Sequence, residues 1–127
     1  MTDVVTLQLP RERDFFGVAH LVLGGLGARF DLTYDVLDDM STALDELMNR
    51  REAIEAVTLE VWVDDGALSA NVGPFGGRVV DELHASDAGL GLRRVLETVV
   101  DDVAVSERDG AHWVELRKHL EAVSDDS

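Results

Sequence analysis

The chain has 127 residues and a mass of 13.9 kDa, which suits one domain with a single hydrophobic core. Hydrophobic residues make up 46% of the sequence, so the composition excludes a chain that is disordered throughout. The 26 acidic and 11 basic residues give a net charge of −15, which opposes binding to nucleic acids and anionic membranes, and the lack of cysteine excludes disulfides and thiolate chemistry.

The N-terminal half predicts one strand and two helices. A β-rich segment at residues 4–9 ends at Pro10 and is expected to be an edge strand. Apolar residues then recur at helical spacing over residues 15–30 and 36–48, and Thr33 is a natural cap for the second helix. The first helix contains four glycines, which are unfavourable in a helix and indicate that another backbone packs close to it.

The C-terminal half predicts two β-hairpins with a third helix between them. Four segments have the pattern of strands, at residues 57–63, 68–72, 103–105 and 113–116. Asp64-Asp65-Gly66 is expected to be a hairpin turn, because glycine tolerates the positive φ that such a turn requires. The stretch from Gly73 to Asp87 is expected to be a loop with one short helical turn, and a helix follows over residues 92–100.

The element order β-α-α-β-β-α-β-β predicts an α+β fold. Its architecture is a two-layer sandwich, in which three helices cover one face of a mostly antiparallel sheet. We expect residues 1–118 to form this single domain and residues 119–127 to form an acidic C-terminal tail. The sequence contains no signal-peptide pattern and no apolar run that could span a bilayer, so we expect a cytoplasmic protein.

Three short motifs accompany this order of elements. They are Ala43-Leu44-Asp45-Glu46-Leu47-Met48-Asn49-Arg50, Asn71-Val72-Gly73-Pro74-Phe75 and Ala88-Gly89-Leu90-Gly91-Leu92. Together with the element order, they resemble the Bergerat-fold ATPases, the histidine-kinase and gyrase-type (GHKL) superfamily. The short length and the C-terminal hairpin are most similar to the anti-sigma-factor serine/threonine kinases, and the likeness extends from Val4 to about Lys118.

The first motif corresponds to the family's catalytic and metal-binding helix. In that family a glutamate activates the acceptor hydroxyl, and an asparagine four residues later holds Mg²⁺ against the triphosphate. Here Asp45 and Asn49 have this spacing, whereas Glu46 has the family's acid but Arg50 as its partner. The resemblance therefore gives Asp45 and Glu46 as vestigial catalytic candidates and Asn49 as the Mg²⁺ candidate. A solvated, charged helix end is the alternative explanation.

The second motif corresponds to the family's adenine-binding segment. There an aspartate accepts a hydrogen bond from the adenine amino group, and glycines let the backbone approach the base. The resemblance places Asn71 and Gly73 in these roles, although an asparagine accepts only through its carbonyl oxygen. A shift of one residue would place the apolar Val72 there instead, and Phe75 stands where the second glycine is expected.

The third motif looks like the family's phosphate lid. Gly89, Leu90 and Gly91 precede the predicted third helix, and unobstructed backbone N–H groups at a helix N-terminus suit phosphate oxygens. The resemblance therefore implies ATP and Mg²⁺ as cofactors, or neither of them if the site is fully degenerate.

The resemblance implies an anti-sigma-factor-like regulatory protein that controls transcription by protein–protein binding. Its partner would be a sigma factor or an anti-sigma antagonist, and its degenerate ATP site would be weak or absent, so we expect a non-catalytic protein. The alternative is an active ATP-dependent serine/threonine kinase that phosphorylates an anti-sigma antagonist. A third hypothesis is a homodimeric scaffold without a ligand.

Overall fold

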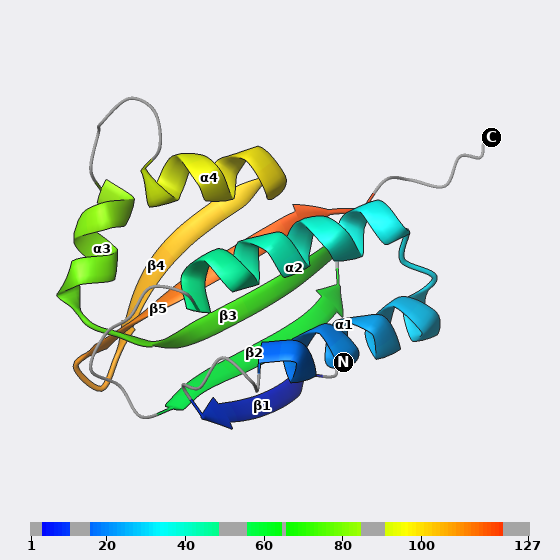
Figure 1. Cartoon of the computed structure of the whole chain (residues 1–127), viewed down its shortest axis with the longest axis horizontal. Coiled ribbons are helices and arrows are strands. Elements are labelled where there is room, and N and C mark those ends of the chain that lie inside the picture. Colours follow the sequence, from blue (N-terminus) through cyan, green and yellow to red (C-terminus); the bar gives the residue numbers. More distant parts are fainter. Residues whose placement is uncertain (1–3, 11–15, 49–55, 65, 85–90, 121–127) are drawn as a thin grey trace.

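A computed structural model describes residues 4–10, 16–48, 56–64, 66–84 and 91–120 of the chain (Figure 1). In chain order its elements are β1 (Val5–Pro10), α1 (Phe16–Phe30), α2 (Tyr34–Met48), β2 (Ala56–Asp64), β3 (Ala67–Phe75), α3 (Gly77–His84), α4 (Leu92–Val99), β4 (Asp102–Arg108) and β5 (Ala111–His119). The five strands form one sheet in the order β1-β2-β3-β5-β4, and every neighbouring pair is antiparallel.

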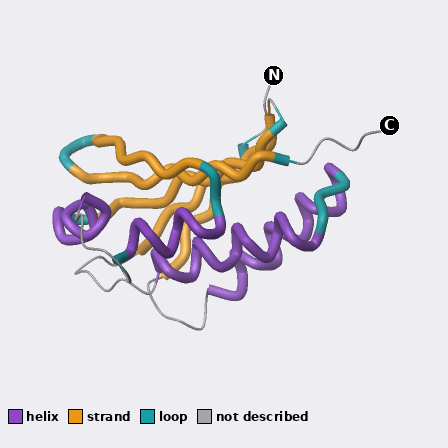
Figure 2. Tube along the Cα trace, turned by 90° about the horizontal axis from the view of Figure 1, so that it is seen from above, coloured by secondary structure: helices purple, strands orange, loops and turns teal. Residues whose placement is uncertain are grey.

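The helices and the sheet form two separate layers. Figure 2 shows the helices together on one side of the strands, and in Figure 1 α2 runs between α1 and α4. The central helix α2 packs against α1, α4 and β5. The structure therefore has the α+β two-layer architecture that the sequence predicts.

The described residues contain four helices, one more than the three predicted. The additional helix, α3, lies in the stretch where the sequence indicates a loop with one helical turn. Val79 and Leu83 are both fully buried, and their spacing of four places them on one side of α3. The preceding glycines and the shortness of this apolar pattern conceal the helix in the sequence.

The predicted caps and turns are present. The backbone N–H of Val36 donates to Oγ1 of Thr33 at 3.2 Å, so Thr33 caps α2 as expected. Gly66 has a φ of +72° in the β2–β3 hairpin, and Gly110 has a φ of +81° between β4 and β5. Both turns need the left-handed backbone that glycine adopts readily.

The hydrophobic core fills the space between the two layers. Helix α2 buries Val36, Met40, Ala43, Leu44, Leu47 and Met48. Their spacing forms one apolar stripe, which explains why α2 is easy to identify from the sequence. No helix in the described part of the chain has the length and apolar character to cross a membrane.

Candidate functional site

The predicted site residues come from the C-terminal half of α2, the end of β3 and the start of α4. Of these residues, Asn49, Gly89 and Leu90 lie outside the described part of the chain. The described candidates are Asp45, Glu46, Asn71, Gly73 and Gly91. Their positions determine which of them can act together.

Asp45 faces the neighbouring helix α1. Its Oδ1 lies 3.0 Å from Nε2 of His20, and both side chains are partly exposed. This contact joins α1 to α2, so Asp45 already serves as a partner of His20. Sequence reasoning missed this contact because the pairing of two helices decides which of their polar residues meet.

Glu46 lies on a different side of α2. It follows Asp39 by seven residues, so the two side chains leave the helix in nearly the same direction, two turns apart. Nζ of Lys118 on β5 lies 3.0 Å from Oδ2 of Asp39, which shows that this side of α2 faces β5. The two acidic candidates therefore leave α2 on different sides, with Asp45 towards α1 and Glu46 on the side of Asp39.

Asn71 and Val72 point to opposite faces of the sheet. Val72 is fully buried in the core between the layers, and adjacent strand residues alternate in direction. The side chain of Asn71 therefore lies on the face away from the helices, where its Nδ2 donates to Oε1 of Glu60 at 3.3 Å. Val72 is the residue that β3 turns towards the helix layer.

Asn71 belongs to a polar cluster on the outer face of the sheet. This outer-face cluster consists of Glu60 on β2, Asn71 on β3, Arg108 on β4 and Trp113 on β5. Arg108 donates from Nη2 to Oε1 of Glu60 at 3.0 Å and from Nη1 to Oε2 at 3.3 Å. Its guanidinium lies 4.3 Å from the centre of the Trp113 ring. The cluster thus ties four strands together by side chains.

Electrostatics within the outer-face cluster favour a charged Glu60. The hydrogen bonds from Arg108 lower the pKa of the Glu60 carboxyl and outweigh the opposing effect of burial. The Asn71 amide donates to the same carboxylate and lowers this pKa further. Among the described residues, Oδ1 of Asn71 is buried and has no hydrogen-bond partner. The amide is therefore fixed through its nitrogen.

Gly73 is required by the same cluster. A Cβ atom at this position would lie 2.5 Å from Cδ2 of Trp113, so the indole ring packs directly on the glycine backbone. The absence of a side chain at Gly73 thus has a structural cause on the outer face of the sheet.

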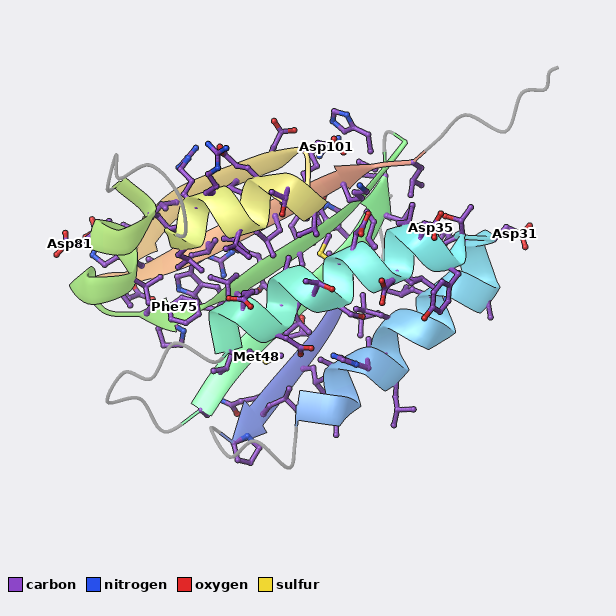
Figure 3. The ribbon with its side chains drawn as sticks, turned by 45° about the horizontal axis from the view of Figure 1, so that its top comes forward. Asp31, Asp35, Met48, Phe75, Asp81 and Asp101 are labelled. Atoms are coloured by element: carbon purple, nitrogen blue, oxygen red, sulfur yellow. The ribbon has the colours of Figure 1, made fainter. Side chains whose placement is uncertain are left out.

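Apolar side chains occupy the end of β3. Phe75, which stands where the family's second glycine is expected, is 2% exposed and belongs to the hydrophobic core. Figure 3 shows it between α3 and the C-terminal end of α2, near Met48. Met48 is also buried in the core. This end of the sheet therefore offers mainly apolar surface to the helix layer.

Gly91 starts α4 with an extended backbone and without a side-chain cap. Its φ and ψ are −64° and 153°, and its carbonyl accepts from Val95 N–H at 3.1 Å. Arg93 in the first turn pairs with Glu97 at 3.1 Å and donates to the backbone carbonyl of Val103 at 3.4 Å. The Arg93 side chain thus connects α4 to β4.

Comparison with known proteins places these observations in context. No family model matches the chain. The chain is 28% identical over 142 residues to the serine-protein kinases RsbW of Bacillus velezensis and Bacillus subtilis, covering 93% of this chain and 86% of each relative. It is 26% identical to RsbW of Listeria monocytogenes, covering 90% of this chain and 86% of the relative.

A solved structure has the same fold. The crystal structure of the RsbU and RsbW domains of a Mycobacterium tuberculosis protein matches with a TM-score of 0.66 and 14% sequence identity. The match covers 94% of this chain but only 32% of that longer chain. The chain is therefore similar to RsbW serine-protein kinases over most of its length and shares its fold with this structure, which confirms the resemblance to the anti-sigma-factor serine-kinase family.

Proposed function

We propose that the protein is an anti-sigma-factor-like regulator that controls transcription by binding a sigma factor or an anti-sigma antagonist. The observation that carries this proposal is the similarity to RsbW serine-protein kinases along 93% of the chain. The net charge of −15 supports a protein partner over a nucleic acid, because the chain repels phosphate backbones.

The described residues do not fit the family's adenine contact. That contact needs a polar acceptor facing the helix layer, whereas β3 turns Val72 and Phe75 into the core. Asn71, the one polar candidate, is held on the outer face by Glu60. This arrangement supports a weak or absent ATP site, so the proposed activity does not depend on catalysis.

Binding to purified sigma factors tests the proposed function. The full chain would be titrated by calorimetry with each sigma factor and each anti-sigma antagonist of its host bacterium, with and without MgATP. We expect one of these proteins to bind. If it is a sigma factor, adding the chain should reduce transcription in vitro from the promoters that this sigma factor recognises. Failure of every one of them to bind would contradict the proposed function.

A nucleotide titration tests the degenerate site separately. A ligand at a hundred times its Kd stabilises a protein by about 2.7 kcal/mol, which thermal unfolding detects readily. We expect the melting temperature to stay unchanged in millimolar MgATP. A clear increase would show that the apolar end of β3 still admits a purine.

An active serine kinase is the second candidate function. It is favoured by the names of the relatives and by Glu46, which has the family's acid, whereas its neighbour Asp45 is engaged by His20 on α1. Phosphate transfer to an anti-sigma antagonist, followed with radiolabelled ATP, would reveal this activity. Glu46→Gln should then abolish transfer, whereas Asp45→Asn, its neighbour on the α1 side, should leave most of it. Absence of transfer by the unmodified chain would exclude this candidate.

A further inference from the structure

A groove between α1 and α2 shares only Asp45 with the predicted site residues. It has a volume of about 400 Å³ and is lined by residues of both helices. Its apolar lining includes Leu23, which is 1% exposed, and Leu37, which is half-buried. Leu37 and the exposed Gly24 therefore supply the apolar part of the lining that reaches solvent, whereas Leu23 is buried.

Two glycines of α1 show where this groove is open. A Cβ atom at Gly27 would lie 2.5 Å from Cδ1 of Leu37, so at Gly27 the side chain from α2 fills the space. A Cβ atom at Gly24, about one turn earlier, would meet nothing within 4 Å among the described residues. Gly24 lines the groove, so a side chain from another molecule has room there.

The α2 wall of the groove is acidic. Asp38 and Asp45 both line it, and seven residues separate them, which corresponds to about 10 Å along the helix axis. The described lining contains no lysine or arginine, and its basic group is His20 beside Asp45. At the other end, Tyr34 is 78% exposed. Ser41 and Thr42 lie between the two aspartates on α2, and Leu23, Gly24 and Leu37 supply the apolar part of the lining. A groove that is partly apolar and acidic suits a segment that is both apolar and basic.

Charge determines which occupant fits. A second copy of the chain, docked symmetrically through this groove, would bring the same acidic wall of each copy towards the other, and each copy carries a net charge of −15. A basic amphipathic helix has the opposite charge and a matching shape, because apolar helix faces commonly lie in such grooves.

We propose that this groove binds an amphipathic helix of the protein partner. Lys or Arg side chains seven residues apart on that helix pair with Asp38 and Asp45, and an apolar side chain between them enters the space over Gly24. The proposal rests on the proposed function, since it identifies the surface by which the regulator holds its partner.

A pair of designed peptides tests the groove without knowledge of the partner. One fluorescent peptide of about 18 residues carries leucines on one face and two lysines seven residues apart, a length at which helices form in water. Its twin has glutamates in place of the two lysines. We expect the lysine peptide to bind the full chain at least about tenfold more tightly than its twin, because like charges oppose docking.

Matched variants then locate the binding. Gly24→Leu fills the groove, whereas Gly25→Leu makes the same change at an equally open position outside the groove lining. We expect Gly24→Leu to lower the affinity for the lysine peptide at least about tenfold. Gly25→Leu should change this affinity less than about twofold. Asp38→Lys should weaken binding similarly, whereas Glu107→Lys on β4 makes the same charge change elsewhere and should not. Circular dichroism confirms that each variant is folded.

The outcomes separate this inference from the proposed function. If Gly24→Leu and Gly25→Leu change the affinity for the lysine peptide equally, the groove is not the binding surface. The same conclusion follows if the sigma factor or antagonist that the chain binds holds the Gly24→Leu variant as tightly as the unmodified chain. Loss of a dimer in Gly24→Leu, measured by light scattering, would identify a second copy as the occupant and refute the proposal. Peptide binding with no sigma factor or antagonist bound would refute the proposed function alone.

Discussion

Both faces of the sheet contain buried residues, but the burial arises by different means. On the face towards the helices, Leu59, Val72 and Val114 pair across neighbouring strands and lie in the apolar core. On the other face no described helix covers the strands, as Figure 2 shows. Ser69 and Asn71 on that outer face are nevertheless 0% and 6% exposed.

Long side chains from neighbouring strands provide the cover on the outer face. Nη1 of Arg117 lies 3.5 Å from Oγ of Ser69, and Trp113 packs on Gly73. Burial on the inner face thus rests on apolar area, whereas burial on the outer face rests on a few specific pairings. The two faces should therefore respond differently to truncation, to added volume and to pH.

Truncation on the inner face should have the largest effect. Leu116 is fully buried on β5, and we expect Leu116→Ala to lower the free energy of unfolding by about 2–5 kcal/mol, because it removes buried methyl groups and leaves a cavity. Urea denaturation measures this loss. Glu115→Ala, one residue earlier and on the outer face, should cost less than about 1 kcal/mol. Similar losses for the two variants would mean that the faces do not differ in this way.

Added volume on the outer face should have a smaller effect. We expect Gly73→Ala to destabilise the fold by about 1–3 kcal/mol, because the new methyl group would overlap the Trp113 ring. Gly77→Ala is the matched control, since a Cβ there meets nothing within 4 Å. In a Trp113→Ala background the cost of Gly73→Ala should largely disappear, which a double-mutant cycle measures. If Gly73→Ala lowers the free energy of unfolding equally in that background, the Trp113 ring does not pack on Gly73.

The sequence predicts the inner face better than the outer face. Regular apolar spacing indicates α2 and the hairpin strands, and local chemistry identifies Thr33 as a cap and Gly66 as a turn residue. These features depend on neighbours within a few residues. The outer-face cluster depends instead on Glu60 and Arg108, which are 48 positions apart in the sequence.

The candidate site is harder to predict for the same physical reason. The sequence leaves open whether Asn71 or Val72 faces the helices, because a shift of one residue exchanges the two faces of a strand. Likewise, the spacing of Asp45 and Glu46 cannot tell which of them meets α1, since that depends on how the two helices pack. The adenine, phosphate and Mg²⁺ roles of the candidate residues stay predictions.

The smallest effect should appear as a difference in pH dependence on the outer face. Because Arg108 lowers the pKa of Glu60 in the folded protein, the folded state holds this proton less tightly than the unfolded state, whose carboxyl has the ordinary value of 4.5. The resulting stabilisation is fully present above that value and is lost as the pH falls through the lower pKa of the folded state.

We expect Glu60→Gln to be less stable than the unmodified chain at neutral pH by less than about 1 kcal/mol, since Arg108 is largely exposed. The difference should shrink on acidification, whereas Glu107→Gln should differ little from the unmodified chain at any pH. Urea denaturation across this range measures both variants, and a difference for Glu60→Gln that stays constant down to strongly acidic pH would show that its pairing with Arg108 does not stabilise the outer face.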